Sequence, residues 1–260
     1  MNFKGFYYLY LKETKRFLIV WGQTLLGPVV TSLLFLFIFV IALKGTSSLN
    51  YLPAGISFIE FLVPGLIMMQ VTQNAFANTS SSILMSKVFG TINDILSAPL
   101  NSKEIALAYI LSSTTRGVIT ASIILTTCYL ATMSFTAITI LHLFVGIYFL
   151  IMASFILGAM GLICGLWAVN FDRMSTLTNL VIMPLSFLSG TFYSTSSLPN
   201  FVQKVVHFNP VFYMIDGFRY SFTGVVDFNI TVEATVLFIL AVLLYIVCIA
   251  LIKFGYNTKN

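Results

Sequence analysis

Residues 21–43 read WGQTLLGPVVTSLLFLFIFVIAL, a run of 23 residues without Asp, Glu, Lys, Arg or His. A second run of 27 residues that lacks these side chains covers positions 143–169. A helix needs about 20 apolar residues to cross the roughly 30 Å hydrocarbon core of a bilayer. Both runs therefore predict transmembrane helices, and we expect an all-α integral membrane protein.

The composition of the whole chain supports this class. Asp, Glu, Lys and Arg make up only 8% of its 260 residues, whereas ordinary soluble domains contain about 25%. The net charge of +5 does not require a nucleic-acid partner, because Lys and Arg in membrane proteins mainly mark cytoplasmic loops. The three cysteines lie in apolar runs, which indicates buried thiols and neither disulfides nor metal ligands.

We expect one membrane domain over residues 1–260, beginning with a helix at 1–18. That helix combines an aromatic face with basic side chains, which favours the membrane–water interface; the alternative is a simple cytoplasmic flank of the first span. The apolar runs predict six transmembrane helices, at 20–43, 58–84, 106–131, 138–169, 175–189 and 232–252.

Six spans place both termini on one side of the membrane, and the positive charges indicate which side. With the N-terminus inside, nine Lys and Arg residues flank the cytoplasmic ends and three, including Arg219, flank the outer ends. This distribution follows the positive-inside rule, so both termini are predicted to be cytoplasmic. Arg116 is in neither group, because we expect its long side chain to snorkel from the third span to the cytoplasmic interface.

The cytoplasmic segment 90–100 predicts a short helix that crosses no membrane. Its candidate functional residues are Thr91, Ile92, Asp94, Ile95, Leu96 and Pro99. The threonine and the aspartate have capping-box spacing, the three aliphatic residues form an apolar face, and the proline ends the helix. The segment is either a loop helix packed on the bundle or a docking element for a cytoplasmic partner.

Polar side chains recur every three or four residues along the second predicted span, so they share one helical face. The amides on this face are Gln70, Gln73, Asn74 and Asn78. Unpaired amides are costly in hydrocarbon, so this face should contact another helix or a wet cavity. Hydrogen bonding between helices and the lining of a pathway are both open.

Two further patterns concern packing. Gly161 and Gly165 have the GxxxG spacing that allows close helix approach. Residues 190–230 combine prolines with many aromatic side chains, which predicts short helices that lie at, or dip into, the outer membrane interface.

Missing motifs exclude several kinds of chemistry. The chain has neither a G-x-x-x-x-G-K-[ST] phosphate loop nor an H-E-x-x-H zinc motif, and its two histidines, His142 and His207, are far apart in sequence. The predicted spans contain no acidic residue at central depth of the kind that proton-coupled transporters use. We therefore expect no catalytic site, no metal site and no cofactor bound to this chain.

Several stretches resemble a known family. FLSGTFY at 187–193, LP at 198–199 and NPVFYMIDGFRY at 209–220 are similar to the C-terminal signature of ABC-2 type permeases, the membrane subunits of bacterial ATP-binding cassette exporters. VPGLIMM at 63–69 and DILSAPL at 94–100 resemble the family's second span and the loop after it. The resemblance covers nearly the whole chain and preserves the order of the segments.

The resemblance implies an ABC-2 (type V exporter-like) fold in the bacterial inner membrane. Besides the interfacial helix and six spans, it implies a re-entrant helical hairpin at 190–230. It also implies that residues 90–100 form a coupling helix, which transmits movement from an ATPase subunit and which the N-terminal helix supports. Asn93 and Asp94 depart from the paired acids that relatives often carry there. The four amides are then expected to face a second permease copy or the conduit.

The resemblance also implies partners. Two permease copies, expected as a homodimer in contact with membrane lipid, would pair with two separate ATPase subunits that bind ATP and Mg. This chain would form the substrate path and the mechanical link, and would not itself be an enzyme. The alternatives are a stand-alone secondary transporter or channel, which would need no ATPase, and a membrane enzyme acting on lipids, for which no cluster of nucleophile and base is found.

Overall fold

The computed structural model describes residues 2–43, 56–132, 140–195 and 198–255, and this part of the chain contains helices and no strands. The all-α prediction is confirmed, and the described residues of the predicted spans are mainly helical. The segments are α1 (Phe3–Ile19), η1 (Gly22–Leu26), α2 (Gly27–Leu43), α3 (Phe58–Val88), α4 (Ile92–Ser97), α5 (Ser102–Thr132), α6 (Ile140–Trp167), α7 (Phe171–Leu177), η2 (Thr178–Ile182), α8 (Met183–Leu188), α9 (Asn200–His207), α10 (Pro210–Thr223) and α11 (Ile230–Lys253).

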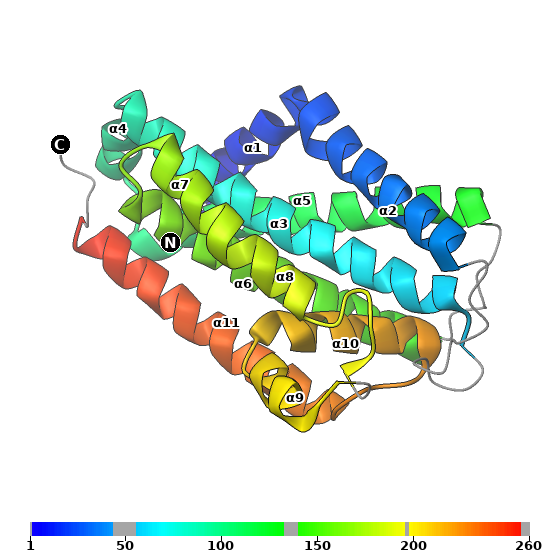
Figure 1. Ribbon diagram of the computed structural model, residues 1–260. Coiled ribbons are helices and arrows are strands. Elements are labelled where there is room, and N and C mark those ends of the chain that lie inside the picture. Colours follow the sequence, from blue (N-terminus) through cyan, green and yellow to red (C-terminus); the bar gives the residue numbers. More distant parts are fainter. Residues whose placement is uncertain (1, 44–55, 133–139, 196–197, 256–260) are drawn as a thin grey trace.

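Helix α3 is the centre of the bundle. It packs against α6, α5, α10 and α2, and Figure 1 shows it running among the other long helices. Most of its side chains from Phe61 to Leu84 are buried, polar ones included. Its neighbours therefore shield its polar residues from the surroundings of the protein.

The GxxxG pattern of α6 makes the close helix contact that its spacing predicts, and the structure shows that its partner is α3. A Cβ atom at Gly161 would overlap the backbone carbonyl oxygen of Phe76, and one at Gly165 would lie 2.8 Å from that of Ser80. These glycines let the two backbones approach to a distance that any larger side chain would prevent.

Four helical stretches in the described residues are long and apolar enough to cross a membrane: Gly22–Ile41, Ser102–Ala131, His142–Trp167 and Ile230–Lys253. The predicted spans at 58–84 and 175–189 are not among them. Helix α3, which contains residues 58–84, is not among them because its buried amides and hydroxyls lower its mean hydropathy. Residues 175–189 are not among them because they belong to the three short segments α7, η2 and α8. The number of six spans stays a prediction.

The π-helical segments η1 and η2 each end two residues before a proline, Pro28 or Pro184. Proline has no N–H to donate to the fourth preceding carbonyl, and its ring crowds that carbonyl. A wider π turn relieves this crowding without interrupting the helix. Each of these two prolines therefore follows a π segment inside a continuous helical stretch.

The start of α1, α4, the start of α5 and the end of α11 gather at one end of the bundle. Asn2 bonds to Glu104 and Pro99, and the Tyr245 hydroxyl donates to the Lys103 carbonyl oxygen. Helices α9 and α10 and the start of α11 lie at the opposite end (Figure 1). The described residues of the predicted region 190–230 thus include the helices α9 and α10, and the depth of this region in a membrane stays a prediction.

The α3–α6 contact gives a matched test. Gly161→Ala should lower the free energy of unfolding by about 1–3 kcal/mol, the usual cost of overpacking a tight contact. Gly27→Ala is the control, because nothing lies within 4 Å of a Cβ at Gly27. It should be neutral or slightly stabilising. Thermal unfolding of both variants in detergent measures the difference, and equal stabilities would contradict close packing at Gly161.

Candidate functional site

The predicted coupling segment forms α4, a helix of six residues between α3 and α5. Gly90 lies in the left-handed region with a φ of 75°, where the chain turns out of α3. Ile92 is buried with side chains of α1, α5 and α11, and Ile95 and Leu96 pack partly against the same cluster. Thr91, Asp94 and Pro99 are exposed at the surface. The segment thus has an anchored apolar face and a free polar face.

The capping box predicted at the start of α4 is wrong. The Thr91 side chain makes no capping bond, because its backbone already has helical angles (φ −69°, ψ −9°). Its hydroxyl donates instead to the Ser86 carbonyl oxygen, at 3.4 Å. Thr91 therefore connects α4 to the end of α3.

Helix α1 holds the connection between α4 and α5 in place. The backbone N–H of Asn2 donates to Glu104 Oε1 at 2.7 Å, and the Asn2 amide donates to the Pro99 carbonyl oxygen at 3.2 Å. The other oxygen of Glu104 accepts the N–H of Asn101 at 2.9 Å. Glu104 therefore ties the start of α1 to the start of α5.

An open groove of about 500 Å³ lies between α1 and α4. Its walls come from both helices: Asn2, Gly5, Tyr8, Leu9, Lys12, Thr91, Asp94, Ile95, Ala98, Pro99 and Leu100. Apolar side chains form most of its lining, and Lys12 and Asp94 add one charge of each sign. Such a surface can accept a side chain of a protein partner, with polar groups to orient it.

A buried polar cluster joins α1, α3 and α5. Its members are Glu13, Arg16, Asn74, Asn78, Ser82, Ser112 and Arg116. Arg116 donates to Asn74 Oδ1 at 2.6 Å and to Asn78 Oδ1 at 3.4 Å. Arg16 donates to the same Asn78 oxygen at 2.9 Å and to the Asn78 carbonyl oxygen at 2.8 Å. Asn78 thus connects two guanidinium groups inside one chain, and Asn74 holds the second of them.

Glu13 supplies the negative charge of this cluster. It is 1% exposed, bonds to Arg16 Nε at 3.1 Å and accepts the Ser82 hydroxyl at 2.5 Å. A buried charge is tolerated when paired and hydrogen-bonded, so the carboxylate offsets part of the cost of placing the half-buried Arg16 beside the buried Arg116. The prediction that Arg116 snorkels is wrong, because its side chain turns into the bundle and bonds to α3.

The amide face of α3 is therefore divided. Asn74 and Asn78 belong to the polar cluster, which is the interhelical hydrogen bonding that their spacing allowed. Gln70 is buried outside the cluster and Gln73 is half-buried. Their contact with a second copy or a conduit stays a prediction.

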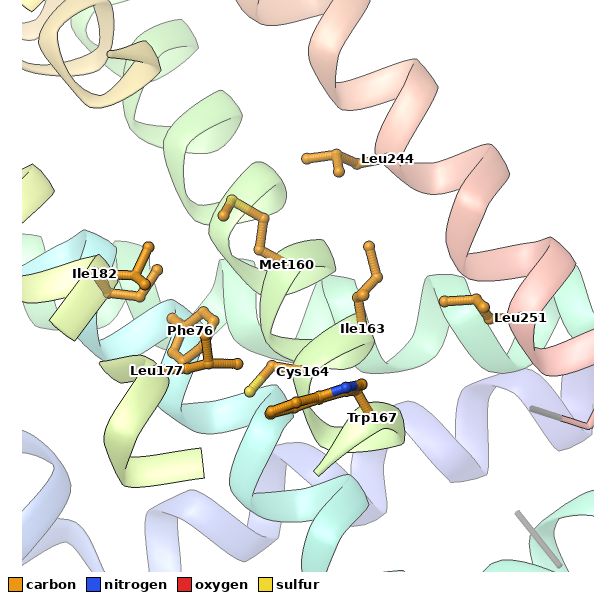
Figure 2. A pocket seen from close by; sticks show the side chains of 10 residues that line it. Phe76, Met160, Ile163, Cys164, Trp167, Leu177, Ile182, Leu244 and Leu251 are labelled. Carbon is orange, nitrogen blue, oxygen red and sulfur yellow. The ribbon is translucent and has the colours of Figure 1, made fainter. Parts of the chain in front are cut away.

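A second pocket, of about 400 Å³, opens between α6, α11 and the α7–η2 stretch (Figure 2). Its walls are almost wholly apolar: Phe76, Met160, Ile163, Cys164, Trp167, Leu177, Val181, Ile182, Leu244 and Leu251. Figure 2 shows Met160, Ile163, Cys164 and Trp167 of α6 between Leu177 and Ile182 on one side and Leu244 and Leu251 on the other. This pocket can hold hydrocarbon and offers little polar recognition.

Several buried charges escaped the sequence interpretation. Arg219, expected at an outer loop, is 4% exposed, with its guanidinium 3.8 Å from the Phe61 ring centre and bonded to the carbonyl oxygens of Gly190 and Phe61. Asp216 and Glu233 are buried nearby. Spacing could have revealed Glu13, which continues the buried positions Leu9 and Phe17 at intervals of four. Arg219 follows the buried positions Val211 and Ile215 at intervals of four, so the same spacing also marks it as an inward-facing position.

Within the described residues, no three His, Cys, Asp or Glu side chains are grouped so that they could hold a metal ion. The described residues bring together a surface helix with a groove beside it, a buried polar cluster and an apolar pocket.

Comparisons with known proteins agree with this description. Residues 4–223 match the family model described as ABC-2 type transporter. The chain is 35% identical over 252 residues to the inner membrane transport permease YadH of Escherichia coli K12. The aligned residues cover 97% of this chain and 96% of the relative. The YadH proteins of E. coli O157:H7 and Shigella flexneri show the same identity and coverage.

The polar cluster predicts a large effect of removing its central cation. Arg116→Ala should lower the free energy of unfolding by about 1.5–3 kcal/mol, since it leaves the buried amide oxygen of Asn74 without a charged donor. The exposed Arg173→Ala is the control and should change stability by less than about 0.5 kcal/mol. Unfolding in detergent would contradict the assignment if both variants matched the wild type.

Proposed function

This chain belongs to the ABC-2 type transporter family, and from that premise we propose that it is the permease subunit of an ABC exporter. It forms the substrate pathway across the bacterial inner membrane and couples that pathway to ATP hydrolysis on a separate nucleotide-binding subunit. ATP and Mg bind to the partner, and this chain contributes no bond-breaking chemistry. One observation carries the proposal: a short helix with an exposed polar face is anchored in the bundle by Ile92.

The anchoring of α4 supports a role as the coupling helix. Ile92 packs in a buried cluster with Leu9 of α1, Ile105 of α5 and Cys248 of α11. A push on α4 therefore reaches three long helices through side chains already in contact. Nucleotide states of a docked ATPase can shift the balance between two bundle conformations by such rigid-body contact.

The brace between α1 and α4 gives the partner a composite docking surface. A subunit that contacts Thr91, Asp94 and Pro99 also meets the groove whose other wall is α1. Because Asn2 and Glu104 hold the two walls together, α4 and α1 move as a unit. The end of the bundle that carries α4 is accordingly the cytoplasmic end, with both termini inside.

The functional assembly we propose is two copies of this permease, as a homodimer, with two ATPase subunits. Helix α2 presents apolar side chains to its surroundings, among them Leu34, Phe37 and Ile41, which suit lipid or a second permease. Gln70 and Gln73 are the amides of α3 outside the polar cluster, and we place them toward the second copy or the conduit.

Charge reversal on α4 tests the docking surface. Asp94→Lys should weaken recovery of the ATPase with the permease about tenfold, since about 1.4 kcal/mol of lost contact energy corresponds to that factor. The control is Asp172→Lys, because Asp172 is also an exposed acid in the first turn of a short helix. Co-purification from native membranes measures both. Normal association of the Asp94 variant would overturn the docking role, and ATP-independent transport by the purified chain would favour a secondary transporter.

Thiol labelling tests the amide face. In a variant whose native cysteines are replaced by Ala, Gln73→Cys should crosslink to the second copy or react with a water-soluble maleimide. Thr72→Cys, on a fully buried position of the same turn, should do neither. Labelling of Gln73→Cys by lipid-soluble reagents alone would show that this face meets lipid.

A further inference from the structure

The apolar pocket between α6, α11 and the α7–η2 stretch runs parallel to the long helices (Figure 2). Its lining lies within residues 160–167 of α6 and residues 244–251 of α11, and each of these stretches covers about two helical turns, or about 10 Å. Each stretch begins inside a helix that is long and apolar enough to cross a membrane and reaches the last turn of that helix. One leaflet contributes about 15 Å to the hydrocarbon core, so the pocket has the length of a large part of one leaflet.

This pocket lies at the α4 end of the bundle. The Lys87 ammonium group, in the last turn of α3, donates to the carbonyl oxygens of Leu166 at 2.6 Å and of Ala168 at 2.7 Å. These bonds hold the end of α6 beside the end of α3, from which the chain continues into α4. If this end is cytoplasmic, as in the proposed function, the pocket opens to the inner leaflet.

The walls of the pocket suit a hydrocarbon chain. Apart from the sulfur atoms of Met160 and Cys164 and the indole N–H of Trp167, the lining side chains consist of carbon and hydrogen. Trp167 and Val181 are also exposed at the protein surface, so the pocket opens to the surroundings of the bundle. Burial of apolar surface is therefore the main attraction that these walls can offer.

A cation lies at the rim of the pocket. Arg173 precedes the lining residue Leu177 by one turn of α7, and side chains at this spacing are neighbours on one helix face. Helical side chains tilt toward the N-terminus of their helix, so Arg173 extends away from the pocket and toward the α4 end. Its side chain is exposed, and among the described residues both ion pairs belong to Glu13, which leaves the Arg173 guanidinium without a carboxylate partner.

We propose that the pocket binds one acyl chain of a membrane phospholipid, whose phosphate group pairs with Arg173. A guanidinium group forms strong, paired hydrogen bonds with phosphate oxygens, and a phospholipid carries this anion at the end of its hydrocarbon chains. The cation at the rim and the apolar walls below it match these two parts of one molecule in the same order. Figure 2 shows Leu177 and Ile182 on one side of the pocket and Leu244 and Leu251 on the other, so a bound chain contacts both sides and holds α7–η2 to α11.

This lipid site is separate from the docking surface at α4. Only the assignment to the inner leaflet rests on the proposed function, because binding can be measured on the purified permease in detergent without an ATPase. Normal ATPase recovery with no lipid binding would reject the lipid site alone, and lipid binding without ATPase recovery would reject the docking role alone.

Tryptophan fluorescence provides the first test. The chain has two tryptophans, so Trp21→Phe leaves Trp167 in the pocket as the single reporter. Phosphatidylglycerol with brominated acyl chains, added to this variant in detergent micelles, should quench Trp167 in a saturable manner. Arg173→Ala in the same background should require about tenfold more lipid, the effect of losing one charged hydrogen-bond partner. Lys4→Ala is the control, because it removes another exposed cation at the α4 end, outside the pocket.

Filling the pocket provides the second test. Val181→Phe adds volume to the lining and should weaken quenching of Trp167 by a similar factor. Leu180→Phe is the matched control, because the neighbouring Leu180 lies outside the lining and is 71% exposed. Equal quenching in Val181→Phe, Arg173→Ala and the parent protein would show that Trp167 only meets bulk lipid, and would overturn the proposal.

Two further outcomes would assign the pocket to another occupant and overturn the proposal. A brominated alkane without a phosphate group that quenches Trp167 as strongly as the phospholipid, with no effect of Arg173→Ala, would indicate a site for neutral hydrocarbons. Quenching that begins only when the protein is diluted to monomers would show that a second copy covers the pocket.

Mass spectrometry of the intact wild-type protein keeps the proposal testable if the variants do not fold. Purified in mild detergent, the wild type should retain phospholipid after washing, and added phosphatidylglycerol should restore it after its removal. Inorganic phosphate should not displace the lipid, because it cannot occupy the apolar walls. Wild-type protein that neither retains nor rebinds phospholipid would overturn the proposal.

Discussion

The structure depends on one constraint: the polar groups of α3 must find partners inside the bundle, because lipid offers none. Helix α3 carries amides and hydroxyls along much of its length, and α5, α6 and α10 surround it. The glycines of α6 bring one neighbour to backbone distance, and Arg116 of α5 and Arg16 of α1 bond to the asparagines. A helix too polar for lipid thus becomes the axis on which more apolar helices pack.

The same constraint explains what the sequence could predict. Long runs without charge located the apolar helices, and GxxxG spacing predicted a close helix contact on α6 but not that its partner is α3. Periodic spacing also showed that the amides of α3 share a face. It could not tell which partner they meet, because Arg16 and Arg116 come from helices 62 and 38 residues away in sequence and no local pattern encodes that pairing. The same reason hid the partners of Arg219, which are the carbonyl oxygens of Phe61 and Gly190.

The two ends of the bundle are built differently. At the α4 end, hydrogen bonds from Asn2 and Glu104 fasten a surface helix without covering its polar face, which suits a surface that must meet another protein. At the far end, Arg219, Asp216 and Asp227 bond mainly to backbone groups of neighbouring segments, which holds the connections between α8, α10 and α11. The α4 end is thus held by hydrogen bonds but leaves a polar surface exposed, whereas the far end is held together by hydrogen bonds of charged side chains.

The π-helical segments carry a consequence for chain length. A π turn holds one residue more than an α-helix would over the same flanks. Inserting or deleting a residue in a regular helix rotates everything beyond it by about 100° and turns a lipid-facing surface inward. At η1 and η2 the loss of a residue can instead be absorbed by a return to α geometry, with the flanking faces preserved. Homologues that differ in length by one residue should therefore differ at these two points, just before Pro28 and Pro184.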